Sequence, residues 1–290
     1  MEVTSSKIYV KQSLIDESFN SDKVNHYRLF IQLGNDFLST CILDDVRKKF
    51  ICLEDFHFPF AGNPETLAER CEITKQQSKL LMLDNFRSVN CCVRFPKATL
   101  VPEPLYDKRS EELFFDFNFN KGDEEIILTD DLKLIHAKNL FTIPSLIQKM
   151  LHYWFPDCGI HHYSTAFLNG LFISNRKEKS VTLNVHPEEF DMAVTEGSKL
   201  IFYNRFHYVT SEDFLYFILF TLEQLQLNDK TVDVKIAGDI DKHSLYYKSA
   251  CKYLPNISFM EQLHTYKYSY KFEALPPAAH FTLFNQFLCE

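Results

Sequence analysis

Residues 157–162 read DCGIHH and bring three residue types that bind metal ions into six positions. Such a group could hold zinc, which prefers sulfur and nitrogen ligands in tetrahedral geometry. The spacing matches no zinc pattern, however, and neighbouring histidines of a strand point to opposite faces. We therefore interpret this segment as a turn followed by core residues, and we predict no metal site.

Cys91 and Cys92 could supply a nucleophile, because a cysteine thiolate attacks electrophilic atoms. They lie in a predicted strand, 88–95, in which one thiol faces the core and the other faces outward. No activating base accompanies them, so we predict no catalytic cysteine. The eight cysteines of the chain contain no CxxC pair, which indicates reduced thiols that mostly fill the core.

Residues 114–119 read FFDFNF, so aromatic rings alternate at Phe115, Phe117 and Phe119. In a strand these rings would form one apolar stripe. We favour a stripe that packs in the core, and the alternative is an exposed stripe that contacts a partner protein. A second aromatic segment, 214–220, is apolar nearly all round a helix, which indicates burial and not a ligand site.

The elements that position these residues are clearest between residues 181 and 206. Val181, Leu183 and Val185 alternate with polar residues, which predicts a half-buried strand, and residues 190–194 repeat the pattern. Gly197 forms a tight turn before a third strand, 199–206. A capping sequence then opens a predicted helix at 211–227. A strand at 232–237 and a helix at 242–253 follow.

An earlier part of the chain repeats this order of elements. Asn63 and Pro64 mark a helix start, as a cap and a first-turn proline. The predicted elements are strands at 27–33, 37–43 and 50–58, a helix at 64–83 and a strand at 88–95. Beyond them we expect helices at 110–117, 144–155 and 278–288, strands at 125–129 and 133–137, and a short strand and helix within 159–174. Corresponding elements lie about 150 residues apart, as in a duplicated fold.

Two βββαβα units in tandem resemble the actin-like, sugar-kinase and Hsp70 ATPase superfamily, in which nucleotide binds in a cleft between two ribonuclease-H-like domains. The whole chain also resembles an uncharacterised Bacteroidetes family, a domain of unknown function with an actin-like ATPase fold. The resemblance implies an α/β fold of tandem duplicated ribonuclease-H-like domains. It divides the chain into an N-terminal extension (1–24), a first domain with an insertion (25–158) and a second domain with a C-terminal helix (159–290).

The resemblance also implies the positions that would surround a nucleotide. The first phosphate loop, Asp-x-Gly-Ser/Thr in the superfamily, here reads Gln32-Leu33-Gly34-Asn35, so the glycine is kept and the carboxylate is lost. The second loop matches residues 184–188, NVHPE, and the adenosine loop matches residues 236–239, IAGD. The implied cofactor-binding residues are Gly34, Asn35, Asp36, His186, Glu188, Gly238 and Asp239.

The departures from the superfamily pattern predict a degenerate nucleotide cleft. Amides at Gln32 and Asn184 cannot replace carboxylates that position Mg²⁺, and Pro187 has no N–H for a phosphate. The chain has only seven glycines, which limits close approach of the backbone to a nucleotide. We therefore expect no catalytic residue and no cofactor, with ATP and Mg²⁺ as an alternative in which Glu188 or Asp36 supplies the metal-binding acid.

The composition excludes several classes of function. A net charge of -8 disfavours nucleic-acid binding, which calls for a basic surface. The first 20 residues lack a secretory signal, and the longest apolar run, 214–222, is about half of a membrane span. We predict a cytoplasmic protein with no membrane span that binds a protein partner, and its oligomeric state stays open.

Two functions remain as hypotheses. The leading one is a non-catalytic scaffold or interaction protein that has lost its ATPase motifs. The alternative is an actin-like switch protein that binds ATP weakly. A phosphotransferase of the sugar-kinase type would need a catalytic aspartate beside a glycine-rich second loop, which the sequence lacks.

Overall fold

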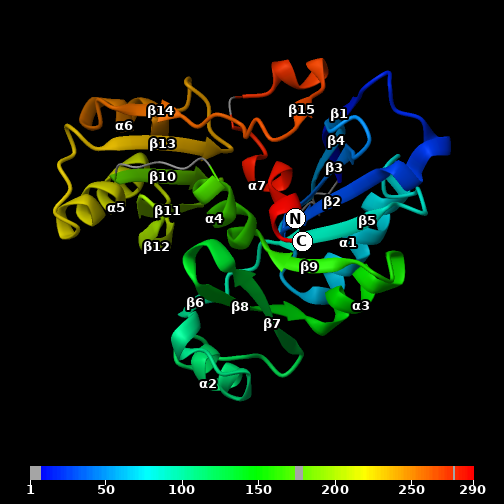
Figure 1. The fold of residues 1–290 in the computed structure, drawn as a ribbon, viewed down its shortest axis with the longest axis horizontal. Coiled ribbons are helices and arrows are strands. Elements are labelled where there is room, and N and C mark those ends of the chain that lie inside the picture. The colour runs from blue at the N-terminus through cyan, green and yellow to red at the C-terminus, as the bar shows by residue number, and fades with distance from the viewer. Residues whose placement is uncertain (1–7, 174–178, 277) are drawn as a thin grey trace, which may run out of the picture. The chain divides into compact units, whose positions relative to one another are not determined.

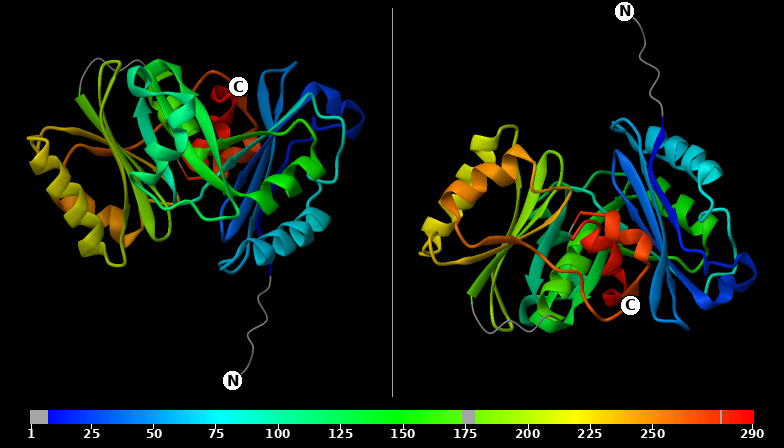
Figure 2. Two further views of the ribbon diagram at one scale, coloured as in Figure 1. Left: turned by 90° about the horizontal axis from the view of Figure 1, so that it is seen from below. Right: turned by 90° about the horizontal axis from the view of Figure 1, so that it is seen from above.

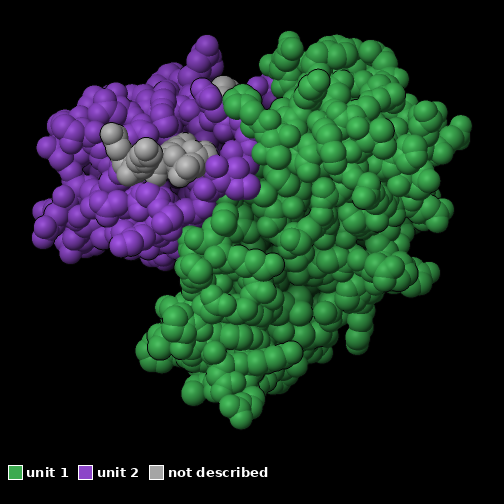
Figure 3. All heavy atoms as spheres, in the orientation of Figure 1, with its two compact units in different colours: residues 1–169, 264–273, 282–290 green, residues 170–263, 274–281 purple. Residues whose placement is uncertain are grey.

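The computed structural model describes residues 8–173, 179–276 and 278–290. Two compact units make up the chain (Figure 3). Unit 1 contains the described residues of 1–169, 264–273 and 282–290, and unit 2 those of 170–263 and 274–281. Each unit has its own central sheet and its own hydrophobic core.

A seven-stranded sheet forms the centre of unit 1 (Figure 1). The order of neighbouring strands is β1-β4-β3-β2-β5-β9, and β15 also pairs with β4. The pairs among β1 to β4 are antiparallel, whereas β2, β5 and β9 are mutually parallel. The strands are β1 (Tyr9–Ile15), β2 (Tyr27–Leu33), β3 (Phe37–Asp44), β4 (Lys49–His57), β5 (Ser88–Val93), β9 (Gly159–His162) and β15 (Lys267–Tyr268).

Strand β2 is buried on both of its faces, because different parts of the chain cover each face. Leu29, Ile31 and Leu33 belong to the core that helices α1 (Pro64–Gln77) and α3 (Ser145–Trp154) complete. Gln32, on the opposite face, accepts a hydrogen bond from Thr282 of the C-terminal segment. Figure 2 shows the two helices on one side of this sheet and the red C-terminal segment on the other.

A smaller antiparallel sheet, in the order β6-β8-β7, belongs to unit 1. Its strands are β6 (Ala98–Pro102), β7 (Glu125–Leu132) and β8 (Ala137–Pro144). The short helix α2 (Glu111–Asp116) packs against it through Phe115, which joins Val101 and Leu140 in a separate apolar cluster. Helix α4 (Tyr163–Ile173) follows β9.

The sheet of unit 2 has five strands in the order β12-β11-β10-β13-β14. Helices α5 (Ser211–Gln224) and α6 (Leu245–Tyr253) lie on one of its faces (Figure 2). A reciprocal capping box between Thr210 and Asp213 starts α5 as the sequence predicts. The strands are β10 (Lys179–Val185), β11 (Glu189–Glu196), β12 (Lys199–His207), β13 (Asp233–Gly238) and β14 (Ile257–Phe259), and the short helix α7 is Phe281–Phe284.

The two central sheets share one connectivity. The order β4-β3-β2-β5-β9 in unit 1 corresponds to β12-β11-β10-β13-β14 in unit 2. Among the five strands compared in each unit, the first three along the chain are antiparallel and the next two pair in parallel. The predicted α/β fold with two βββαβα units is therefore confirmed.

Two predicted elements in unit 1 end or begin at other residues. The helix expected to reach residue 83 ends at Gln77, because the hydroxyl of Ser78 turns inward and donates to the buried carboxylate of Glu54 over 2.6 Å. The strand expected at 133–137 is instead a 3-10 turn up to Ile135. The left-handed backbone of His136 (φ 53°) separates this turn from β8, of which only the first residue was predicted as strand.

Other predictions failed for the C-terminal helix and for four short strands. The C-terminal helix expected at 278–288 begins only at Phe281, because Ala278 and His280 have a positive φ of 56° that a helix does not accommodate, and it consists of α7 and a separate 3-10 turn at Gln286–Leu288. Strands β1, β6, β14 and β15 were not predicted. These strands are short or polar, and they form by pairing with strands that are distant in sequence.

The aromatic run at 114–119 begins in α2, close to the helix predicted at 110–117, and continues from Phe117 into the turn that follows α2. Phe115 is fully buried and its ring lies 5.4 Å from that of Phe119, as expected for residues four apart on a helix. Phe117 is 89% exposed and Leu113 is 72% exposed. The predicted alternating stripe is therefore wrong, and the run divides into core rings and an exposed pair.

This division predicts different costs for two neighbouring substitutions. Phe115→Ala should lower the free energy of unfolding by about 3–5 kcal/mol, because it leaves a cavity in a packed cluster. Phe117→Ala should change it by no more than about 0.5 kcal/mol, because the ring is exposed. Urea unfolding of both variants measures the difference, and equal costs would contradict the helical assignment.

Asp16 joins the residues after β1 to the segment after β15. Its carboxylate accepts hydrogen bonds from Lys49 Nζ (2.7 Å), Ser269 Oγ (2.6 Å) and the Ser18 backbone N–H (2.9 Å). Burial by itself raises the pKa of Asp16, but these hydrogen bonds outweigh burial and hold the pKa well below the usual 3.8. The ionised carboxylate therefore stabilises the folded state.

Because the folded pKa lies below the unfolded pKa, the stabilisation by Asp16 is present above the unfolded value and lost as pH falls through the folded value. Asp16→Asn should lower the free energy of unfolding at neutral pH by about 1.5–3 kcal/mol. The deficit relative to wild type should shrink as pH falls below about 4. Urea unfolding across this pH range tests both points, with the exposed Asp22→Asn as control, and a pH-independent deficit would refute the linkage.

Candidate functional site

The first predicted loop, at Gly34, Asn35 and Asp36, is the tight turn between β2 and β3. The Gly34 N–H donates to the carbonyl of Phe37 (3.0 Å), and a Cβ on Gly34 would lie 2.2 Å from the Phe37 ring. The carbonyls of Asn35 and Asp36 accept hydrogen bonds from the N–H groups of Ala61 (2.7 Å) and Phe58 (2.9 Å). The turn therefore holds the segment between β4 and α1.

Arg94 places a positive charge beside this turn. Its guanidinium lies 3.7 Å from the Asp36 carboxylate and 4.8 Å from the centre of the Phe37 ring, and its side chain is only 11% exposed. The backbone N–H of Arg94 donates to Leu33 at the end of β2. Asp36 is therefore an ion-paired acid on the turn.

Gln32 occupies the strand-end position where the resemblance expects a carboxylate. It is buried, and its side-chain oxygen accepts a hydrogen bond from Thr282 Oγ1 over 2.8 Å. The next turn of the C-terminal segment is fixed in the same way, because Gln286 donates to the backbone carbonyl of Ile31 over 2.8 Å. The end of β2 is thus covered by polar groups of unit 1 itself.

A pocket of about 230 Å³ lies beside Asn35 in unit 1. Its wall is mostly apolar, and Lys97 and Glu125, which form an ion pair at 2.8 Å, are its charged residues. The apolar lining residues are Phe60, Ala61, Pro64, Leu67, Phe95, Pro96 and Pro144. Its volume is below the range of about 300–1,000 Å³ that small-molecule sites usually have.

The second predicted loop is the turn at residues 186–188, between β10 and β11. The His186 N–H donates to Glu189 (2.8 Å), and the Glu188 carbonyl accepts from Tyr208 (3.0 Å). The hydroxyl of Tyr208 donates to the backbone carbonyl of His186, and burial raises the pKa of this phenol. Glu188 itself is exposed at the tip of the turn.

Gly238 and Asp239 follow β13 and lie beside the same turn. Gly238 has a φ of 95°, and a Cβ there would lie 2.2 Å from the Val185 carbonyl oxygen. The Asp239 N–H donates to that same oxygen over 2.7 Å, and the Gly238 N–H donates to Ala278 over 3.3 Å. The Asp239 carboxylate is 3.6 Å from Nδ1 of His186. The structure thus brings three predicted residues of unit 2 together and leaves Glu188 at the turn tip.

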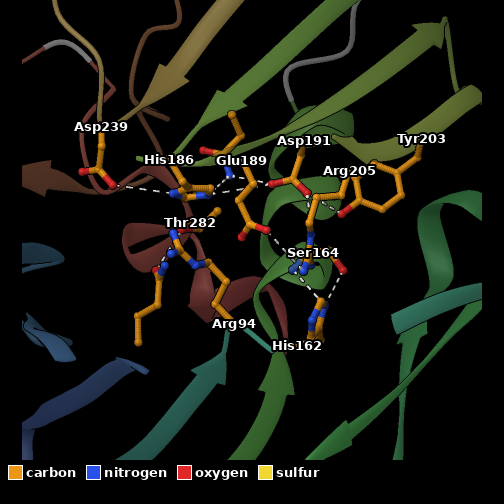
Figure 4. Close-up of polar contacts among 12 residues, drawn as sticks. Arg94, His162, Ser164, His186, Glu189, Asp191, Tyr203, Arg205, Asp239 and Thr282 are labelled. Carbon is orange, nitrogen blue, oxygen red and sulfur yellow. Dashed lines mark hydrogen bonds and ion pairs between the residues drawn. The ribbon is translucent and has the colours of Figure 1, made fainter. Parts of the chain in front are cut away.

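A buried carboxylate, Asp191, organises the polar face of this sheet (Figure 4). It accepts hydrogen bonds from Asn184 Nδ2 (3.1 Å) and the Tyr203 hydroxyl (2.8 Å). Arg205 Nε and His186 Nε2 lie 3.7 and 3.8 Å from its oxygens. The charge of Asp191 is therefore balanced by the Arg205 guanidinium and two hydrogen-bond donors.

Sequence reasoning missed Asp191, Tyr203 and Arg205. The signal was present in the strand pattern, because Asp191 alternates with Phe190 and Met192 and must face away from their core. The hairpin registers then place Asp191 opposite Asn184 on one side and Arg205 on the other. Strand pairing predicted from the two turns would have identified the cluster.

Residues 157–162 are a turn and a core strand as predicted. His161 Nδ1 lies 2.8 Å from the Asp130 carboxylate, whereas the ring of His162 contacts Ser164 Oγ (2.6 Å) and the Phe95 carbonyl (3.1 Å) on the other side. Asp130 also accepts from the hydroxyl of Thr165, which stabilises the first turn of α4. Within the described ranges, no three His, Cys, Asp or Glu side chains are arranged to hold a metal ion.

Cys91 and Cys92 are both fully buried. The prediction that one thiol faces outward is wrong, because Cys92 packs under Tyr163 and Ala166 on the second face of the sheet. Burial raises the pKa of both thiols well above the usual value, so both stay protonated.

The chain belongs to a family described as protein of unknown function (DUF3822), whose model matches residues 16–257. It is similar to a crystal structure from Bacteroides thetaiotaomicron of a protein with actin-like ATPase fold and unknown function. The TM-score is 0.74 at 20% identity, over 83% of this chain and 93% of that one. It is also similar to the PilM-PilN type IV pilus biogenesis complex, with a TM-score of 0.59 at 12% identity, over 91% of this chain and 98% of that one.

These likenesses show an actin-like ATPase fold. No curated protein matches the chain. Among the helices of the described ranges, none is long and apolar enough to cross a membrane.

The close approach of β13 to β10 predicts a strong requirement for glycine at residue 238. Gly238→Ala should lower the free energy of unfolding by about 3 kcal/mol, because it adds both a strained φ and a contact with Val185. Gly197→Ala is the matched control, since Gly197 has a φ of 59° but open space around it, and should cost about 1 kcal/mol. Equal melting temperatures of the two variants would contradict this.

Proposed function

We propose that this member of DUF3822 is a non-catalytic scaffold or interaction protein that has lost its ATPase motifs and acts on a protein partner in the cytoplasm. The observation that carries the proposal is that the backbone N–H groups predicted to bind phosphate are already hydrogen-bonded within the protein. The N–H groups of Gly34, His186, Gly238 and Asp239 each donate to a backbone carbonyl of their own unit. These are groups that an ATP-binding loop would direct at phosphate oxygens.

The side chains at these loops support the same proposal. Mg²⁺ in a nucleotide site is held through carboxylates and phosphate oxygens. Gln32 offers a neutral amide that is buried and already bonded to Thr282. Asp36 is paired with Arg94, and the pocket beside Asn35 is small and mostly apolar. None of these features favours a hydrated metal and a triphosphate.

The exposed residues and the net charge of the chain support a protein partner. Exposed large apolar residues such as Leu113 and Phe117 are typical of contact sites, and the net charge of -8 disfavours nucleic acid. The similar PilM structure is itself of a complex with PilN. We propose a scaffold of this fold in the Bacteroidetes.

The alternative is an actin-like switch protein that binds ATP weakly. One observation favours it, because the glycine expected in the adenosine loop is present at Gly238 and has a positive φ. His186 and Asp239 lie within 3.6 Å of each other beside this glycine, so polar groups are available there. This arrangement makes Asp239 the residue to substitute if ATP binds.

Thermal unfolding with millimolar ATP and Mg²⁺ separates the two proposals. A ligand at 100 times its dissociation constant stabilises a protein by about 2.7 kcal/mol, which raises the melting temperature by about 4–5 °C in a chain of this size. We expect no Mg²⁺-dependent rise. A rise that Asp239→Asn abolishes, and that Asp229→Asn at a half-buried residue retains, would refute the scaffold proposal and establish the switch.

A further inference from the structure

Helix α2 directs two large apolar side chains away from the sheet on which it packs. It lies beside β6 and β8 of unit 1 (Figure 1), and its rings at Phe115 and Phe119 join the apolar cluster there. Leu113 and Phe117 are four residues apart and so share the other side of the helix. They are 72% and 89% exposed. We name these two residues the apolar pair.

Acidic residues adjoin the apolar pair. Glu112 and Asp116 form the next row of the helix, because each comes one position before a member of the pair. Lys121 donates to Glu112 over 2.9 Å, and this bond raises the pKa of Lys121, with further contributions from Asp116 and Asp123. One ammonium is therefore shared by three carboxylates, and negative charge is in excess beside the pair.

The rest of this region has the same excess of acids. Residues 97–138 contain ten acidic and six basic residues. Several are already engaged within unit 1: Lys97 with Glu125, Glu103 with His136, Asp107 with Arg109, Glu111 with Tyr106 and Thr129, Asp130 with His161, and Asp131 with Lys138. In the part of the chain that the structure describes, no ion pair involves Asp116, Asp123, Glu124, Lys108 or Lys133. Three acids and two bases thus remain available to a partner.

This charge distribution selects among occupants of the apolar pair. Two copies of α2 in contact would each bring an acidic surplus, so their association is opposed by like charge. Nucleic acids and anionic lipid surfaces carry phosphate groups and are repelled in the same way. A protein segment with lysine or arginine beside its apolar residues is complementary instead. An amphipathic helix presents both kinds of residue in adjoining rows, as α2 itself does.

We infer that the apolar pair and its acidic row bind a basic amphipathic helix of a partner protein. Apolar residues of that helix pack on Leu113 and Phe117, and its lysine or arginine residues lie against Asp116 and Asp123. Packing of the apolar rows contributes most of the affinity, and the charges contribute selectivity and orientation. The inference rests on the proposed function in assigning the chain a protein partner, and it adds the chemistry of that partner.

A random 16-residue peptide library displayed on phage and selected against the full chain tests this inference. The selected peptides should combine lysine or arginine with apolar residues at helical spacing, and one of them, synthesised with a fluorophore, is the probe. Leu113→Gln combined with Phe117→Gln should weaken its binding about tenfold or more, measured by fluorescence anisotropy. Both side chains are exposed, so this variant keeps the packed face of α2.

Charge reversal supplies a readout that loss of packing does not give. Asp116→Lys should weaken binding of the probe about fivefold. Replacing one lysine or arginine of the probe by glutamate should restore affinity for this variant and lower it for wild type. Raising the NaCl concentration from about 0.05 to about 0.5 M should weaken binding to wild type, because the charges are exposed and screened.

Matched controls come from other exposed positions. Tyr216 and Phe220 are also four apart on a helix, α5, and are 59% and 45% exposed, although the sequence predicted that helix to be buried nearly all round. Their neighbouring row, Leu215 and Leu219, is apolar. Tyr216→Gln combined with Phe220→Gln should therefore leave binding unchanged. Asp22→Lys reverses an exposed charge far from α2 in sequence and should also bind as wild type does.

Three results would overturn the inference. The first is a library that yields no binder, or only binders without basic residues. The second is a probe whose binding responds to neither the apolar nor the charge substitutions at α2. The third is a dimer in sedimentation experiments that the double substitution of the apolar pair dissociates, which would make a second copy the occupant. A Mg²⁺-ATP shift in melting temperature would refute the scaffold proposal without affecting these outcomes, so the two failures are distinguishable.

Discussion

Burial of the central strands on both faces is the constraint on which the rest of this structure depends. A parallel pair such as β2 and β5 is stable only when each face is covered, because its side chains alternate between the faces. Helices α1 and α3 cover one face in unit 1, and the last residues of the chain cover the other. The chain end is therefore part of the fold of unit 1, and its polar groups are bonded to the end of β2.

The same constraint explains the buried polar clusters. A carboxylate that points from a covered strand needs donors within reach, since an unpaired buried charge is strongly destabilising. Asp191 obtains them from Asn184, Tyr203 and Arg205 on the adjacent strands. Asp130 obtains them from His161, the backbone of His162 and Thr165. Both clusters are accounted for by the sheets that contain them, and catalysis need not be invoked.

In the actin-like architecture the loops can pack against their own neighbours without a change of fold, because the topology of a fold and the chemistry of its loops depend on different residues. The strand order and the crossover helices are set by which segments are apolar, whereas nucleotide binding depends on a few residues at turns. In this chain the turns hold their own neighbours: Gly34 closes on Phe37, and Asp239 closes on Val185.

The sequence predicts those features that depend on residues close together along the chain. Alternation and capping residues act locally, so the sequence by itself predicted β2, β10, β11, α5 and the duplication, with bounds close to those observed. It also placed Gly34 in a turn and Gly238 at the end of a strand. Contacts distant along the chain, however, have no local pattern. Only the tertiary structure decided that Ser78 ends α1 on Glu54, that Thr282 bonds to Gln32 and that Phe117 is exposed while Phe115 is buried. The physical reason is that burial and hydrogen bonding of these side chains depend on which distant segment covers them, and that is fixed only when the sheets assemble.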